Sequence, residues 1–220
     1  MTIEKNLEQT IGDFMTGLAQ QAPPQVLSAL TSELIKLRES GAGSAAPAVG
    51  SKAPDFSLPD ARGGTVTLSE LLAEGPAVIA FYRGAWCPFC NLQLHAYQAA
   101  LPQIRALGAE LVAISPQKPD FTGALIEKHE LAFPVLTDLH NTVARSYGLV
   151  FRLSEGLEAL QNGFGNPLPK NNGDESWELP VPGTFVVDRN GIVQRRYVDA
   201  NFTTRMEPAA ILDTLRGLGV

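Results

Sequence analysis

The stretch Phe81-Tyr-Arg-Gly-Ala-Trp-Cys-Pro-Phe-Cys90 contains both cysteines of this 220-residue chain. It overlaps the short apolar run 76–82, which is typical of a central strand covered on both faces. Apolar residues at helical spacing follow it, and Pro88 suits the first helical position because its missing N–H needs no partner there. The stretch therefore predicts a strand, a short loop and a helix that Cys87 caps, with Cys90 in the first turn.

A position at the N-terminus of a helix makes a cysteine sulfur more reactive. The unpaired N–H groups and the dipole of a helix N-terminus favour a thiolate over a thiol. A free cysteine titrates at about 8.5, and helix N-termini or Cys-x-x-Cys settings bring this pKa to roughly 3.5–7.5. The side chains of Cys87 and Cys90 can approach the Cβ separation of about 3.5–4.5 Å that a disulfide requires. We therefore expect a pair that opens and closes reversibly.

Three other interpretations of the cysteines stay open. They could be inert side chains in the core, since free cysteine is often buried. A purely structural disulfide would stabilise little, because the loop that it closes is short. A zinc site needs four ligands, and a single Cys-x-x-Cys lacks the second half of such a site. The histidines that could contribute are scattered along the chain at His95, His129 and His140.

The composition is that of an ordinary globular protein, with 45% hydrophobic and 18% charged residues. This length predicts one domain with an extension. A net charge of −6 and a pI near 5.1 argue against nucleic acid or an anionic membrane as the main partner. The first residues lack the pattern of a signal peptide, and no apolar stretch is long enough to cross a bilayer. We expect a cytoplasmic protein, where a cysteine pair is more often redox-active than structural.

Residues 1–47 form the predicted extension. Apolar side chains recur every three or four residues over 3–19, starting at Ile3, and again over 26–37 after Pro23-Pro24. This pattern predicts a helical hairpin. Its apolar stripe could pack on the main domain or form a homodimer contact, because such a stripe does not say whose surface it covers.

The remainder alternates between strand and helix patterns, which predicts β-α-β crossovers and a mainly parallel core. An Asn-Gly turn at 190–191 between apolar runs predicts a late hairpin. The other expected elements are a hairpin at 56–58 and 66–68, strands at 111–114 and 133–136, and helices at 69–72, 119–130, 141–147 and 208–218.

Residues 149–180 interrupt this alternation. A helix over 153–160 is compatible with the pattern, but 162–173 is rich in turn residues and too long for a routine connection. Trp177 and Leu179 give the segment apolar surface to bury. We therefore predict an ordered flap inserted into the main domain, which spans 48–220.

Over residues 48–218 the chain resembles the AhpC/TSA peroxiredoxin-like family of the thioredoxin-fold superfamily. The residues that carry the resemblance are Gly50-Ser-Lys-Ala-Pro-Asp-Phe-Ser-Leu-Pro59, the cysteine stretch 81–90, and Pro182-Gly-Thr-Phe-Val-Val-Asp188 with the turn that follows it. The resemblance implies an α/β thioredoxin-like fold, in which helices flank a central mixed sheet.

The sequence combines features of two branches of that superfamily. Typical peroxiredoxins carry Pro-x-x-x-Thr-x-x-Cys, which places Arg83 at the proline, Cys87 at the threonine and Cys90 at the peroxide-attacking cysteine. They also carry an arginine where this chain has Pro182. Thioredoxins instead carry Trp-Cys-x-x-Cys opposite a cis-proline, which Trp86 to Cys90 and Val181-Pro182 resemble. If Pro182 is cis, its neighbouring backbone would face the sulfurs and bind a substrate.

Further residues are candidates for binding or activating the substrate. Arg83 is the leading cation for polarising an O–O bond, and Trp86 could shield a thiolate from water; a surface arginine and a packing tryptophan are the alternatives. Trp177 and Glu178 lie in the flap, where Glu178 could accept a proton or be a surface charge. The weaker candidates are Arg152, Arg195, Arg205 and His95.

We interpret the chain as a thiol-based oxidoreductase that reduces hydroperoxides. In the expected cycle Cys87 attacks the peroxide and Cys90 resolves it, and the peroxiredoxin register would exchange these roles. An external thiol or a thioredoxin would restore the pair. A disulfide reductase and a redox-sensing interaction protein are the alternatives. No metal, flavin or nucleotide cofactor is implied, because the sequence has no ligand cluster and no phosphate-binding glycine loop.

Overall fold

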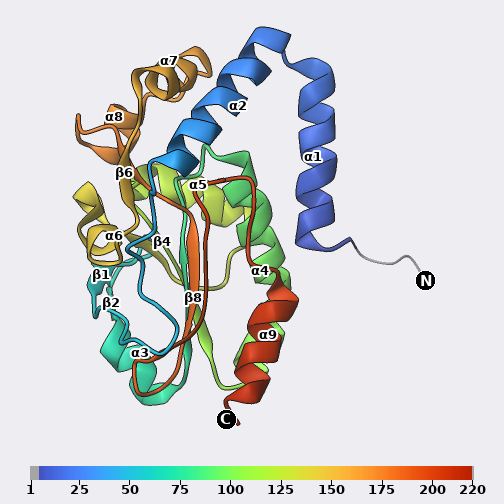
Figure 1. Cartoon of the computed structure of the whole chain (residues 1–220). Coiled ribbons are helices and arrows are strands. Elements are labelled where there is room, and N and C mark those ends of the chain that lie inside the picture. Colours follow the sequence, from blue (N-terminus) through green and yellow to red (C-terminus); the bar gives the residue numbers. More distant parts are fainter. Residues whose placement is uncertain (1–4, 220) are drawn as a thin grey trace.

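The computed structural model describes residues 5–219, and a five-stranded mixed sheet lies at its centre in the order β5-β4-β3-β8-β9 (Figure 1). β3 pairs in parallel with β4 and antiparallel with β8. The mainly parallel core that we expected is thus half antiparallel, because the late hairpin β8-β9 joins the sheet beside β3. The strands span Ala77–Phe81 (β3), Glu110–Ser115 (β4), Val135–Thr137 (β5), Gly183–Val187 (β8) and Val193–Val198 (β9).

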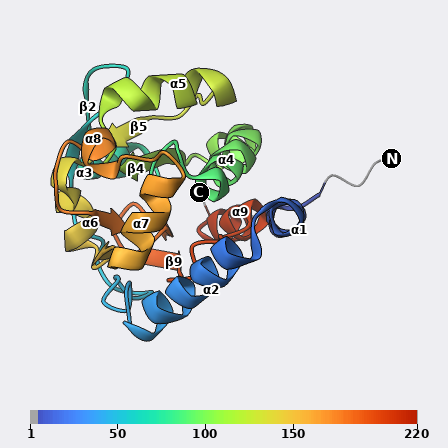
Figure 2. The same cartoon turned by 90° about the horizontal axis from the view of Figure 1, so that it is seen from above.

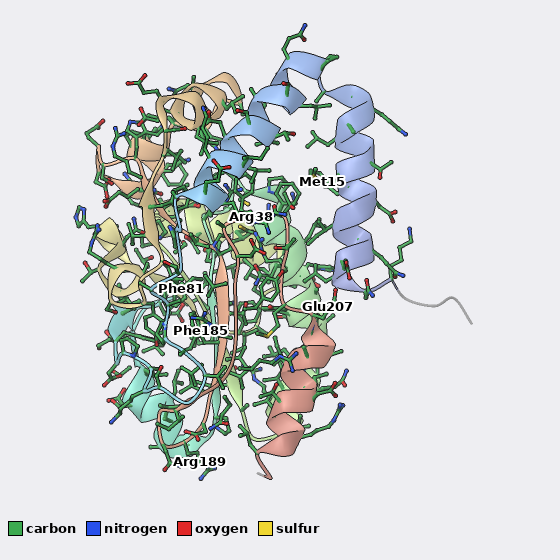
Figure 3. All side chains as sticks on the ribbon, viewed as in Figure 1. Met15, Arg38, Phe81, Phe185, Arg189 and Glu207 are labelled. Carbon is green, nitrogen blue, oxygen red and sulfur yellow. The ribbon has the colours of Figure 1, made fainter. Side chains whose placement is uncertain are left out.

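The central strand β3 is buried along its whole length. Because alternate side chains of a strand point to opposite faces, Val78 and Ala80 join one apolar cluster, and Ile79 and Phe81 join the other. Phe81 packs edge-to-face against Phe185 of β8, and both lie in the middle of the molecule (Figure 3). The continuous apolar run thus predicted the buried strand correctly.

Helices cover both faces of the sheet. The first cluster lies under α4 (Pro88–Ala106), α5 (Pro119–His129) and α9 (Pro208–Gly217), and the second under α3 (Leu68–Glu74) and α6 (Thr142–Ser146). A hairpin of β1 (Ser57–Pro59) and β2 (Thr65–Thr67) and the short 3-10 helix η1 (Leu139–Asn141) complete this part. These elements confirm the predicted order and confirm the mixed α/β architecture.

The N-terminal hairpin consists of α1 (Leu7–Gln21) and α2 (Pro24–Glu39). Asn6 caps α1 in a capping box, and the Glu207 carboxylate accepts the N–H groups of Leu7 and Glu8. Buried Leu7 and Ile11 pack into the cluster that α4 covers. The apolar stripe therefore packs on its own chain, and the homodimer stays a prediction. Ile3, with which the predicted helix begins, lies outside the described residues.

Residues 149–180 fold as β6 (Val150–Arg152), α7 (Glu155–Gly163), α8 (Leu168–Asn172) and β7 (Glu178–Pro180), with β6 and β7 paired. The flap is therefore ordered, and the turn-rich part contains the short helix α8. Seen from above, α7 lies on the same side of the molecule as α2, which it contacts (Figure 2). Glu33 of α2 bonds the Ser154 hydroxyl that caps α7, and it also bonds Lys36 (2.6 Å). The division into a domain with an insertion stays a prediction.

The helices of the described residues are too short or too polar to cross a membrane.

Candidate active site

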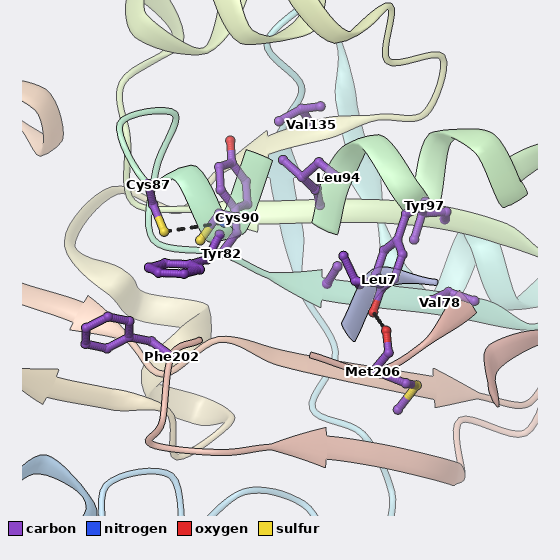
Figure 4. Close-up of a cluster of buried hydrophobic side chains, with 14 of the residues drawn as sticks. Leu7, Val78, Tyr82, Cys87, Cys90, Leu94, Tyr97, Val135, Phe202 and Met206 are labelled. Carbon is purple, nitrogen blue, oxygen red and sulfur yellow. Dashed lines mark hydrogen bonds between the residues drawn. The ribbon is translucent and has the colours of Figure 1, made fainter. Parts of the chain in front are cut away.

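Both cysteines lie at the junction between β3 and α4, and both are free cysteines with no exposed surface (Figure 4). Cys87 is the N-cap of α4, and its sulfur accepts the Cys90 N–H at 3.4 Å. Pro88 occupies the first helical turn. The sequence thus predicted the cap, the helix start and the placement of Cys90 correctly.

The loop before the cysteines depends on Gly84, whose φ of +146° favours glycine. Its carbonyl accepts the Cys87 N–H at 3.1 Å. From the neighbouring strand end, Gln117 accepts the Ala85 N–H at 2.6 Å. Asn91 in α4 donates to the Ala85 carbonyl at 2.9 Å. The loop is therefore held on two sides, which fixes the direction of the Cys87 side chain.

Arg83 lies against Cys87. It is 4% exposed, and its Nη2 donates to the Cys87 sulfur at 3.1 Å. Its guanidinium stacks over the Phe202 ring, 3.7 Å from the centroid, and lies 5.1 Å from the Trp86 ring. Arg83 is thus a buried cation and not the surface arginine that we considered as the alternative.

Arg205 lies against Cys90. Its Nη2 donates to the Cys90 sulfur at 3.3 Å, although the two residues are 115 positions apart. Its Nε donates to Gln93 at 2.6 Å, and its Nη1 to the carbonyls of Phe202 and Thr204 at 2.6 Å each. These bonds aim the guanidinium at the sulfur.

The pKa values of the two thiols are shifted in opposite directions. Burial raises the pKa of the Cys90 thiol, but the hydrogen bond from Cys87 and the charges of Arg205 and Arg83 outweigh burial and hold it well below the ordinary range. Burial and the hydrogen bond with Cys90 raise the pKa of Cys87. These directions favour Cys90 as the thiolate of the pair and Cys87 as its protonated neighbour.

Pro182 does not have the conformation that we considered for it. The Val181–Pro182 bond is trans, since the described residues contain no cis peptide bond. Pro182 is buried directly before β8, whose first residue Gly183 pairs with Phe81 at the end of β3. The backbone arrangement expected for a cis-proline is therefore absent from the described chain.

Neither flap candidate forms a hydrogen bond with the sulfurs among residues 5–219. Glu178 pairs with Arg145 at 2.5 Å, as a flap-surface charge would. Trp177 packs at the edge of the apolar cluster, and its carbonyl accepts the Leu153 N–H. Among the weaker candidates, Arg152 pairs with Glu158, and Arg195 and His95 are exposed.

An apolar cavity of about 250 Å³ adjoins the cysteine loop. We call it the hairpin pocket, because α1 and α2 form one wall of it and α7 with Phe164 forms another. Arg83, Trp86 and Phe202 line its inner end. No group of three or more potential metal ligands occurs in the described chain.

The sequence interpretation underestimated Arg205 and omitted Gln93, Gln117 and Phe202. Arg205 and Phe202 lie in the loop between β9 and α9, far along the chain from the cysteines. A glutamine one helical turn after Cys90 was the available signal, since it lies on the same face of α4.

The sequence of this chain is similar to that of a known protein family. The family model described as the AhpC/TSA family matches residues 49–196. The chain belongs to the AhpC/TSA family. This confirms the family resemblance, and the matched residues include the cysteine loop and the flap but not the N-terminal hairpin.

Plant proteins are among its relatives in the AhpC/TSA family. The chloroplastic peroxiredoxin Q of Sedum lineare is 31% identical over 148 residues, which are 67% of this chain and 67% of that protein. Chloroplastic peroxiredoxin Q of Gentiana triflora is 30% identical over 148 residues, 67% of this chain and 58% of that protein. The match therefore spans about three fifths to two thirds of these relatives.

Solved structures that superpose on this chain show which fold it has. Peroxidoxin BcpB from Mycobacterium tuberculosis superposes with a TM-score of 0.61 at 24% identity, over 78% of this chain and 98% of that one. Peroxiredoxin Q from Xanthomonas campestris superposes with a TM-score of 0.55 at 20% identity, over 74% and 90%. The predicted thioredoxin-like fold is thus confirmed.

Proposed function

We propose that this protein is a thiol-dependent peroxidase that reduces hydroperoxides through Cys90 and Cys87. The observation that carries the proposal is the pairing of a buried sulfur with a cation and with a second thiol: Cys90 accepts a hydrogen bond from Arg205 at 3.3 Å and lies one helical turn from Cys87. Membership of the AhpC/TSA family supports the same chemistry.

The direction of the pKa shift and the peroxiredoxin register favour Cys90 as the attacking sulfur, which reverses the order expected from the sequence. The thiolate is the nucleophile, and the lowered pKa belongs to Cys90. This order also agrees with the peroxiredoxin register, which places Cys90 at the attacking position. Cys87, with its raised pKa, is suited to remain a thiol until the second step.

In the first step the Cys90 thiolate attacks the terminal oxygen of the hydroperoxide. An S–O bond forms and the O–O bond breaks, so that Cys90 becomes a sulfenic acid and the leaving alkoxide takes a proton to become an alcohol. In the second step the Cys87 sulfur attacks the Cys90 sulfur. A disulfide forms, and the hydroxyl leaves with a proton as water.

The two arginines supply the electrostatic part of this chemistry. Negative charge moves from the Cys90 sulfur to the leaving oxygen, and a fixed guanidinium stabilises that oxygen without reorganising. Arg205 is held by Gln93 and backbone carbonyls, and Arg83 is held between aromatic rings. Both cations therefore remain in place as the charge moves.

An external reductant, either a thioredoxin or two equivalents of a small thiol, would return the disulfide to two thiols and would itself be oxidised to a disulfide. Cytoplasmic residence and a homodimer remain predictions. Because both sulfurs are fully buried here, the reductant needs the cysteine loop to move outward before it can attack.

The proposal is tested by steady-state turnover with a dithiol reductant, using hydrogen peroxide, an organic hydroperoxide or a protein disulfide as oxidant. We expect hydroperoxide to be consumed faster than the protein disulfide, and Cys90→Ser to abolish this consumption. His95→Ala, an exposed change on α4, is the control and should keep the wild-type rate. Faster reduction of the protein disulfide would instead assign a disulfide reductase.

A further inference from the structure

The hairpin pocket is apolar almost throughout. Its walls include Phe14 and Leu18 from α1, Leu30 from α2 and Phe164 after α7. Among the residues that the structure describes, Arg83 is the only charged one that lines it. Gln161 and Asn166 are its polar, uncharged lining residues. The pocket therefore suits a ligand that presents hydrocarbon to the apolar walls and a polar group to Arg83.

Arg83 connects the pocket to the reacting sulfurs. Its Nη2 bonds Cys87 at 3.1 Å, and its charge also acts on Cys90. Its Nε is buried and has no hydrogen-bond partner within residues 5–219. A donor left without a partner at the inner end of an apolar pocket is suited to an oxygen of the ligand.

The outer wall of the pocket comes from a part of the chain that the family model does not match. That model covers residues 49–196, and α1 and α2 precede it. The hairpin is nevertheless fixed in place. Phe14 packs edge-to-face on Phe89 of α4, with ring centroids 5.3 Å apart, and Glu33 bonds the cap of α7. The hairpin thus shapes the approach to the cysteines.

We propose that the hairpin pocket selects hydroperoxides with an apolar body of several carbons over hydrogen peroxide, and that Phe14, Leu18 and Phe164 determine this selectivity. The inference rests on the proposed function. A volume of about 250 Å³ is far larger than hydrogen peroxide, since one water takes about 30 Å³ of liquid. Each methylene moved from water to the apolar walls favours binding about fourfold.

The test is the rate constant of the reduced protein with hydrogen peroxide, tert-butyl hydroperoxide and cumene hydroperoxide in a single turnover. We expect the rate constant to rise in this order, by at least about tenfold from first to last. Phe14→Ala and Phe164→Ala should each lower the ratio of the cumene to the hydrogen peroxide rate constant by about fivefold. Phe164 is 55% exposed, so its truncation leaves the fold intact.

Two further variants sharpen the test. Leu18→Trp fills the pocket and should slow cumene hydroperoxide more than hydrogen peroxide. Ile35→Ala is the matched control, because Ile35 lies on the same hairpin, is 54% exposed and does not line the pocket. It should leave the ratio at the wild-type value.

The outcomes separate the two proposals. Rapid reaction with hydrogen peroxide but no gain from an apolar body would overturn the selectivity and leave the peroxidase in place. Equal slowing of all three oxidants by Phe14→Ala and Phe164→Ala would overturn it as well. If no hydroperoxide reacts faster than with free cysteine, the proposed function itself fails.

Discussion

At the scale of residues, two buried arginine side chains of the site lie beside the two cysteine sulfurs. Arg83 and Arg205 are 4% and 8% exposed, and a buried cation is costly unless a partner compensates it. Carbonyl groups, Gln93 and aromatic rings surround them, and the sulfurs are the groups that can supply negative charge. The thiolate and the cations therefore stabilise each other.

Replacing Arg205 with methionine removes the cation that bonds Cys90. The pKa of Cys90 should rise, so that less thiolate is present at neutral pH. We expect the peroxide rate constant at neutral pH to fall about 10- to 100-fold, since a hydrogen bond to a charged group contributes about 1.5–3 kcal/mol. The rate should recover in part as the pH rises, since thiolate forms again but the leaving oxygen still lacks the Arg205 cation, whereas the wild-type rate should stay flat from about 8.5 down to neutrality.

The pH dependence of the peroxide rate constant distinguishes an effect of Arg205 on the pKa of Cys90 from a merely structural effect. A variant that only distorts the site would be slow at every pH. Arg195→Met, which removes an exposed arginine from β9, should keep the wild-type profile. A flat and equally slow profile for Arg205→Met would show that Arg205 does not set the pKa of Cys90.

Gly84→Ala should destabilise the protein and slow oxidation. A Cβ at Gly84 would overlap Trp86 Nε1 and lie 2.6 Å from Gln117 Oε1, in a backbone conformation that favours glycine. We expect a loss of about 1–3 kcal/mol in the free energy of unfolding, measured with denaturant. Gly123→Ala in α5 meets no atom within 4 Å and should be neutral or stabilising. Equal stability of both variants would contradict this account of the loop.

The cysteine pair, its cap and Arg83 could be predicted from the sequence because they lie within one local stretch. Arg205 could not be ranked above other arginines, since its partner is 115 residues away and only the fold brings the two together. Glu178 could not be placed from the sequence for a similar reason. Its nearest partner, Arg145, is set by the position of β7 beside α6.

At the scale of elements, Glu33 joins the hairpin to α7. Its hydrogen bonds with Lys36 and Ser154 lower its pKa, so this contact stabilises the fold above the unfolded pKa of about 4.3 and is lost as the pH falls. Glu33→Leu should lower the melting temperature at neutral pH by about 3–6 °C. Amide exchange should also quicken in α1 and α2.

The matched control is Asp13→Asn on α1, which removes an exposed ion pair with Lys5. Such a pair contributes about 0–1 kcal/mol, so the melting temperature should barely change. If Glu33→Leu leaves both the melting temperature and the exchange of α2 unaltered, the contact does not hold the hairpin.

Most elements followed from their apolar periodicity. The buried strands and the amphipathic helices were predicted close to their observed bounds. Burial of one or two faces requires apolar residues at a regular spacing, which can be recognised in the sequence. The pair β6-β7 and the helix α8 were not, because elements of three to five residues carry too little pattern. Their structure depends on contacts with the rest of the chain.

At the scale of the whole molecule, the redox state should alter stability. Forming the disulfide removes the thiolate that compensates two buried arginines, and the short loop that it closes adds little stability. Because the pKa of Cys90 is lowered on folding, the thiolate contributes stability that is fully present above the unfolded pKa of about 8.5 and is lost as the pH falls.

We therefore expect the reduced protein to melt at a higher temperature than the oxidised protein, with a difference that widens as the pH rises from neutrality to about 8.5. Thermal unfolding with and without a dithiol measures this difference. A higher melting temperature for the oxidised form across this range would contradict it.

The family and the fold could be predicted from sequence because three separated segments carried the resemblance. The position of the N-terminal hairpin over the cysteine loop could not, since an apolar stripe is equally suited to a second copy of the chain. Packing of Phe14 on Phe89 and of Glu33 on the cap of α7 decides its position here.

The central claim is that Cys90 is the sulfur that attacks the peroxide. Its most direct test is the mass of Cys87→Ser and of Cys90→Ser after one equivalent of hydroperoxide, with the modified residue located by peptide mapping. We predict rapid addition of one oxygen to Cys90 in Cys87→Ser, and slow or no addition to Cys87 in Cys90→Ser. Rapid addition to Cys87 with an unreacted Cys90 would contradict the account.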